Sequence, residues 1–139
     1  MGTMADNVEH TPVLRSEVDQ NKKTILLYSP DLNFCFSLSM LFQDRYNVVT
    51  TTNLGMLEKF VASYAADLVM IDAMPSESIV ERLAGLKEVS HNLPIIMLYV
   101  YNAKDVNLDQ AIRTRVDSVF YKPFEINTVS RRIDDLLKP

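Results

Sequence analysis

The chain alternates between short apolar runs and longer segments in which apolar residues recur at helical spacing. Apolar runs without a polar alternation are typical of strands that are covered on both faces of a sheet. Apolar residues at intervals of three and four predict helices with one buried face. The predicted strands are residues 24–28, 46–51, 66–72, 93–100 and 117–121. The predicted helices centre on residues 34–44, 56–61, 79–86, 105–113 and 126–137.

This alternation of five strands with five helices predicts an α/β fold built from βαβ units around a parallel sheet. We expect the flavodoxin-like five-stranded arrangement, with strand order 2-1-3-4-5 and helices on both faces. In this order the loop after the first strand, residues 29–31, faces Asp72 at the end of the third strand. Ligands of such sheets bind beyond the carboxyl ends of the strands, at this point.

The first 22 residues differ from the rest, because they are polar and show no sustained apolar period. This composition favours a disordered leader. Within it, Val13, Leu14 and Val18 could form a single helical turn at most. Residues 23–139 are enough for one domain with its own core.

Composition narrows the possible functions. The net charge is −4, which argues against proteins that bind nucleic acid or a membrane through a basic surface. One cysteine, Cys35, cannot form an internal disulfide and fits a reducing compartment. No apolar run approaches the roughly 18 residues of a membrane span, and no signal peptide is present. We therefore expect a cytoplasmic protein.

Three segments in order resemble the receiver domain of bacterial two-component response regulators. They are Asp72 after the third strand, the fourth-strand segment Pro-Ile-Ile-Met-Leu at 94–98, and Lys-Pro-Phe at 122–124. The resemblance covers about residues 23–139. It implies that Asp72 is at the position that accepts a phosphoryl group from a histidine kinase, and that Lys122 is at the position of the lysine that stabilises this group. It also implies a Mg²⁺ held by an acidic pair, a hydroxyl after the fourth strand and an inward aromatic on the fifth.

The sequence departs from this pattern at the remaining positions. The acidic pair aligns with Ser29 and Pro30, and the next residue, Asp31, is expected to cap the following helix. The hydroxyl position aligns with Tyr99, and the inward aromatic aligns with Val119. Since Mg²⁺ is held mainly through carboxylates, we predict no metal site and no cofactor. We also expect Tyr99 to fill space beside the acceptor position.

We therefore interpret the chain as a degenerate pseudo-receiver, a protein-interaction module in signalling and not an enzyme. Its function would be independent of aspartyl phosphorylation and Mg²⁺, with Asp72 and Lys122 retained as a structural ion pair. The expected contact surface comprises the fourth helix, the fifth strand and the fifth helix. Candidate partners are a histidine kinase, an output protein or a second copy of the chain. The alternative is a working phosphoacceptor at Asp72, with Asp31 completing a shifted metal site.

Overall fold

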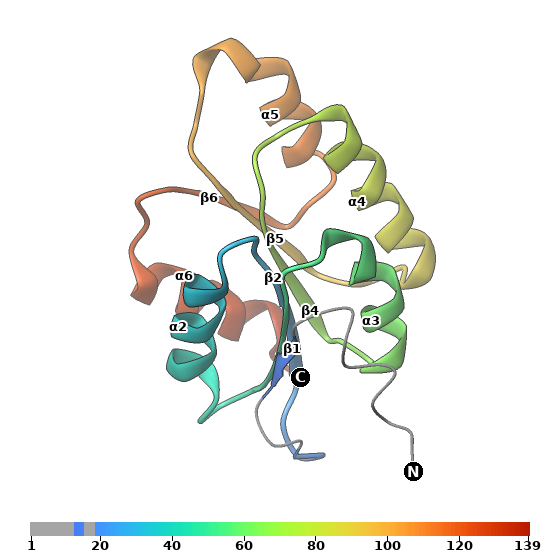
Figure 1. The fold of residues 1–139 in the computed structure, drawn as a ribbon, viewed down its shortest axis with the longest axis vertical. Coiled ribbons are helices and arrows are strands. Elements are labelled where there is room, and N and C mark those ends of the chain that lie inside the picture. The colour runs from blue at the N-terminus through green and yellow to red at the C-terminus, as the bar shows by residue number, and fades with distance from the viewer. Residues whose placement is uncertain (1–12, 16–18) are drawn as a thin grey trace.

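The computed structural model describes residues 13–15 and 19–139. Five parallel strands lie side by side in the order β3-β2-β4-β5-β6. In chain order this is the predicted 2-1-3-4-5 arrangement, which is confirmed. Figure 1 shows β2, β4 and β5 twisting through the middle of the molecule. The strands are β2 (Thr24–Tyr28), β3 (Asn47–Thr51), β4 (Leu68–Asp72), β5 (Ile95–Tyr99) and β6 (Ser118–Tyr121).

A sixth strand, β1 (Val13–Arg15), lies antiparallel to β3 at the border of the sheet, with Leu14 opposite Thr50. The prediction of a helical turn at Val13 and Leu14 is therefore wrong. The free border of β3 offers backbone donors and acceptors that an extended segment can satisfy and a helical turn cannot. Val18 and most of the predicted leader lie outside the described residues.

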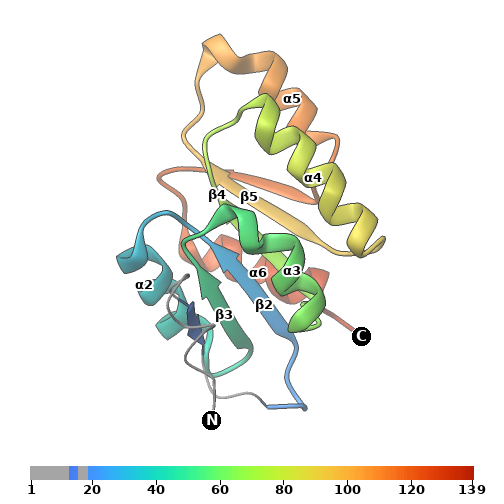
Figure 2. The same cartoon turned by 45° about the vertical axis from the view of Figure 1, so that its right-hand side comes forward.

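Helices cover both faces of the sheet, as Figure 2 shows. One layer contains α2 (Leu32–Phe42) and α6 (Ile126–Leu136). The other contains α3 (Leu57–Ser63), α4 (Glu77–Val89) and α5 (Val106–Arg113), of which α3 and α5 follow the 3₁₀ turns Leu54–Met56 and Ala103–Asp105.

The strands β2, β4 and β5 are almost entirely apolar because their two faces are buried in different cores, whereas β3 reads Asn-Val-Val-Thr-Thr. On β2, Leu26 packs towards α3 and α4, whereas Ile25 and Leu27 pack towards α2 and α6. On β4, Val69 and Met70 divide in the same way. This two-sided burial explains why the sequence shows runs instead of alternation.

Side-chain caps, among them the predicted cap Asp31, fix where two helices begin. Asp31 Oδ1 accepts hydrogen bonds from the backbone N–H groups of Asn33 and Phe34, at 2.9 and 3.3 Å. Ser76 Oγ accepts from the Ile79 N–H at 3.1 Å. Each cap satisfies donors that the first turn of a helix leaves free. In the described ranges, no helix combines the length and the apolar character needed to cross a bilayer.

Candidate functional site

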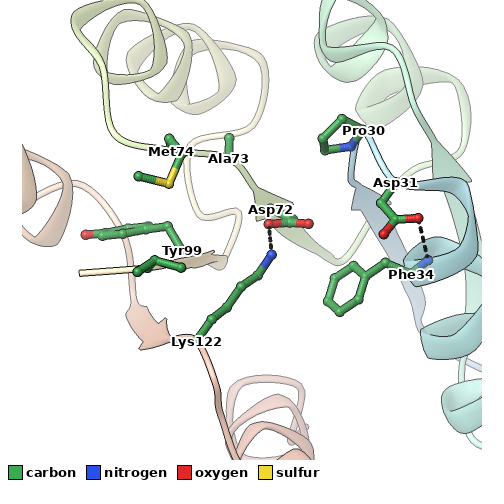
Figure 3. A pocket seen from close by; sticks show the side chains of 9 residues that line it. Pro30, Asp31, Phe34, Asp72, Ala73, Met74, Tyr99 and Lys122 are labelled. Carbon is green, nitrogen blue, oxygen red and sulfur yellow. Dashed lines mark hydrogen bonds and ion pairs between the residues drawn. The ribbon is translucent and has the colours of Figure 1, made fainter. Parts of the chain in front are cut away.

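Asp72 ends β4 at the carboxyl edge of the sheet, where it is 7% exposed. Both of its carboxylate oxygens are paired. Ser29 Oγ donates to Oδ2 at 2.7 Å, and Lys122 Nζ lies 2.6 Å from Oδ1 (Figure 3). Ser29 Oγ in turn accepts from the Asp31 N–H at 3.0 Å. The acid is therefore held by an ammonium group on one side and by a buried hydroxyl on the other.

Lys122 reaches this carboxylate from the loop that follows β6, just before the cis peptide bond to Pro123. Its ammonium group lies 5.0 Å from the centre of the Phe34 ring, which meets Phe124 edge-on at 6.4 Å between centroids. The Lys122 side chain is 33% exposed, and that of Asp72 is 10% exposed. The pair is thus partly shielded from water, which strengthens it relative to a surface ion pair.

A cavity of about 310 Å³ opens beside this ion pair (Figure 3). It receives side chains from the ends of β2, β4 and β5 and from the loop after β6, as expected for the switch point of such a sheet. The lining residues are Pro30, Asp31, Phe34, Asp72, Ala73, Met74, Tyr99, Val100 and Lys122.

The structure thus gathers five of the predicted site residues around one cavity. Ser29 lies fully buried and bonded to Asp72. Val119 is not among the lining residues, because it packs, half-buried, against the core under α3 and α4.

The donors at this edge of the sheet do not fit Mg²⁺. Ser29 presents a hydroxyl where the receiver pattern has a carboxylate, and Pro30 presents none. One oxygen of Asp31 is engaged in capping α2, which Figure 3 shows as its link to Phe34. In the part of the chain that the structure describes, no three His, Cys, Asp or Glu side chains gather as metal ligands would. A hard octahedral cation needs more oxygen ligands than Asp72, whose two oxygens are paired, and the second oxygen of Asp31 supply.

Tyr99 lines the cavity, but its hydroxyl points away from Asp72 (Figure 3). It donates to Oδ1 of Asp109 on α5 at 2.6 Å. Tyr99 was expected to fill space beside the acceptor position, and it lines the cavity with Asp72 while its hydroxyl is bonded elsewhere. A buried tyrosine needs a partner for its hydroxyl, and Asp109 supplies it from the opposite direction.

Asp109 is the centre of a polar cluster that sequence reasoning missed. It is 6% exposed and also accepts from Tyr121 Oη at 2.7 Å, while Arg113 Nε lies 3.3 Å from its other oxygen. The Tyr99 and Tyr121 rings meet at 5.7 Å between centroids. The sequence signal that could have revealed the burial of Asp109 is its spacing. Asp109 lies three residues before the buried Ile112 and so shares its face of the helix.

These contacts shift the pKa values of the groups involved. Burial alone would raise the pKa of Asp109, but the hydrogen bonds from Tyr99 and Tyr121 and the charge of Arg113 hold it below its ordinary value. Burial, followed by the bond to Asp109, raises the pKa of Tyr99. Burial also raises the pKa of the Cys35 thiol, which is fully enclosed. Cys35 is therefore a core residue and not a reactive thiolate.

No protein-family model matches the sequence, and no curated protein matches it. Solved structures do. The signal receiver domain of a response regulator from Bacteroides fragilis superposes with a TM-score of 0.71 at 16% identity, covering 85% of this chain and 98% of its own. The chemotaxis protein CheY4 from Vibrio cholerae gives 0.70 at 18% identity, with coverages of 84% and 99%. A response regulator from Clostridium difficile gives 0.69 at 17% identity, with coverages of 84% and 96%.

The chain has the receiver-domain fold. At these identities the likeness concerns the fold, and function must be argued from the site. Relative to the receiver pattern, this chain keeps the aspartate and the lysine at 2.6 Å from each other. At the acidic-pair positions it carries a buried hydroxyl and a proline instead.

Proposed function

We propose that this receiver-fold domain is a protein-interaction module in signalling that works without aspartyl phosphorylation and without Mg²⁺. The observation that carries the proposal is the environment of Asp72, whose two oxygens are occupied by Ser29 and Lys122. In this arrangement the acid stabilises the ends of β2 and β4 and the loop after β6. Its role is structural, and the domain is not an enzyme.

The charges at the site support this proposal. A phosphoryl dianion that approaches ionised Asp72 meets a like charge, and phosphoryl transfer depends on cations that offset it. Lys122 is a single cation and is already paired with Asp72. Attack by Asp72 would require one oxygen to leave either Ser29 or Lys122. The positions of the acidic pair that would recruit a metal carry Ser29 and Pro30.

The proposed docking surface is formed by α5, β6 and α6. Tyr101 is 44% exposed there, and its ring lies 5.1 Å from that of Tyr121. The Arg113 guanidinium lies 5.0 Å from the Tyr121 ring. Tyrosine and arginine are the side chains that most often dominate binding energy at protein interfaces. A histidine kinase or an output protein is the proposed kind of partner.

A second candidate function is phosphoacceptance at Asp72 from a histidine kinase. Two observations favour it, namely the 2.6 Å contact between Asp72 and Lys122 and the cavity of about 310 Å³ beside them. That volume admits a phosphoryl group, so access alone does not separate the two functions.

Incubation with acetyl phosphate and Mg²⁺, followed by intact-mass spectrometry, distinguishes the two candidate functions. We expect no phosphoryl adduct on the wild-type chain and an identical spectrum for Asp72→Asn. A stoichiometric adduct on the wild type that Asp72→Asn abolishes would establish the phosphoacceptor instead.

A gain-of-function variant tests whether the missing carboxylates are the reason that we expect no Mg²⁺ binding. The double substitution Ser29→Asp and Pro30→Asp restores two carboxylates beside Asp72. We expect it to show Mg²⁺-dependent amide chemical-shift changes near residue 72 that the wild type lacks, because Mg²⁺ binds through carboxylates. Val89→Asp with Thr128→Asp, which adds two carboxylates at exposed positions of α4 and α6, is the control for a general gain of acidity. Equal Mg²⁺ responses of the wild type and the double variant would contradict the proposed cause.

A further inference from the structure

The outward face of α2 is unusual for a surface helix. The helix reads Leu-Asn-Phe-Cys-Phe-Ser-Leu-Ser-Met-Leu-Phe and has no charged residue in its 11 positions. Its inward residues are Cys35, Leu38, Ser39 and Phe42. Its outward side nevertheless carries large apolar side chains that are about half exposed, namely Leu32 at 47%, Phe36 at 56%, Met40 at 57% and Leu41 at 56%. A helix that is apolar on both sides is normally covered on both.

We infer that two copies of this chain associate through the outward faces of α2, packed antiparallel about a two-fold axis near the middle of the helix. Figure 2 shows α2 at the border of the molecule, with α6 beside it in the same layer. This surface is separate from the docking surface on α5, β6 and α6. The inference does not rest on the proposed function, and either can fail alone.

The shape of the face suits a second copy. In a two-fold interface each contact occurs twice, with residue i of one copy against residue j of the other. An antiparallel pair centred on the helix brings Phe36 of each copy beside Met40 of its partner. Exposed Ser37 lies between them along the helix, and its small side chain allows the two backbones to approach.

The charges also favour self-association. An isologous contact sets identical surfaces against each other, so a charged face would repel itself, and this face is uncharged. At its ends, exposed Asp31 caps the N-terminus, while Lys22 Nζ lies 3.2 Å from the carbonyl oxygen of Gln43 at the C-terminus. Antiparallel packing brings each Asp31 towards the partner's Lys22. Because Asp44 and Arg45 also lie at the C-terminal end, this attraction orients the copies and adds little affinity.

One short helix from each copy makes a small interface, so the dimer is expected to be weak and concentration-dependent. Sedimentation velocity of the full chain over a concentration series measures it directly. We expect a monomer–dimer equilibrium that Phe36→Glu weakens by roughly tenfold or more, as for a central apolar residue of an interface.

The matched control is Val89→Glu, which introduces the same charge at an apolar residue of α4 that is 45% exposed. We expect it to leave the dimer unchanged. Circular dichroism establishes that each variant is folded. A wild-type chain that stays monomeric at its highest soluble concentration would overturn the inference. So would a dimer that Phe36→Glu leaves intact, or one that is lost through Tyr101→Glu on the other surface instead.

Disulfide trapping tests the geometry independently. Ser37→Cys places a thiol near the two-fold axis, and Thr128→Cys places one on exposed α6 as the control. Native Cys35 is fully buried and does not compete. Under mild oxidation we expect covalent dimers from Ser37→Cys in large excess over Thr128→Cys. Equal trapping of both variants, or trapping of Thr128→Cys alone, would contradict the α2 interface.

Discussion

Asp72 and Lys122 form an ion pair between two loops that are far apart in the sequence. Each holds a different loop at the carboxyl edge of the sheet, and their charges are 2.6 Å apart where Asp72 is shielded from water. Ser29 completes the environment by donating to the second carboxylate oxygen at 2.7 Å. With both oxygens paired, the cost of burying this carboxylate is offset.

A double-mutant cycle on this pair should show strong coupling. We expect Asp72→Ala and Lys122→Ala each to lower the free energy of unfolding by about 1–3 kcal/mol, since each leaves a partly buried charge without its partner. The double variant should lose less than the sum of the two, by roughly 1 kcal/mol. Urea unfolding at neutral pH gives the three values. Strictly additive losses would show that the two charges do not stabilise each other.

Asp109 predicts a pH dependence of stability. Its folded pKa is lower than its ordinary value of 3.8 because Tyr99, Tyr121 and Arg113 favour the ionised form over the cost of burial. The ionised carboxylate therefore stabilises the native state above the unfolded pKa, and this stability is lost as the pH falls through the folded pKa.

The variant that isolates this effect is Asp109→Asn. At pH 7 we expect it to be less stable than the wild type by about 2 kcal/mol, because hydrogen bonds to a charged acceptor are replaced by neutral ones. The difference should shrink below about pH 4. Unfolding curves of both proteins between pH 7 and pH 2.5 measure it, and a difference that stays constant over this range would contradict the assignment.

At this scale the sequence was informative where a residue has a local or positional role. Asp31 was expected to cap α2 and does so. Tyr99 was expected near the end of the fourth predicted strand, and it is the last residue of β5. The direction of its hydroxyl depends on Asp109, ten residues away on another element. Such pairings arise from tertiary packing and carry no local pattern, so the polar cluster on α5 was missed.

Among the secondary-structure elements, α2 depends on Asp31, for which two roles are considered that mutation can separate. The residue caps the helix, and under the phosphoacceptor hypothesis it would also bind metal. We expect Asp31→Ala to lower the free energy of unfolding by about 1 kcal/mol, and Asp31→Ser to retain most of it, because serine caps helices as well as aspartate does. Thermal unfolding of the two variants provides the comparison. Equal losses in both would mean that the charge, not the cap, is what α2 requires.

Apolar runs predicted β2, β4 and β5 because these strands are covered on both faces. The strand β1 was missed for the opposite reason. It has three residues, lies at the border and forms through pairing with β3, more than thirty residues further along the chain. A segment this short has no periodicity that could distinguish a strand from a turn.

For the whole molecule, contacts with the sheet also come from residues before the predicted domain start at residue 23, among them Asp19. Asn47 at the start of β3 is 3% exposed, and its amide pairs with the backbone of Asp19 in both directions, at 2.7 and 2.8 Å. We expect a chain that begins at residue 23 to be less stable than one that begins at residue 19 by about 1–3 kcal/mol, since the Asn47 amide then loses buried partners.

Urea unfolding of the two truncated chains tests this. Asn47→Ala should destabilise the longer chain and have a smaller effect in the shorter one, where the Asp19 contacts are already absent. An equal effect of Asn47→Ala in both chains would show that residues 19–22 contribute nothing through this amide.

The two borders of the sheet have a consequence for how this molecule can meet others. Among the described residues, β1 has three residues and β6 has four, whereas each strand between them has five. Next to β6, the Arg132 guanidinium donates a hydrogen bond of 3.2 Å to the Asp117 carbonyl oxygen. Short borders of this kind give an incoming peptide little backbone to extend. Contacts with other proteins should therefore depend on side-chain complementarity, and fibre growth by strand addition should be disfavoured even in crowded solution.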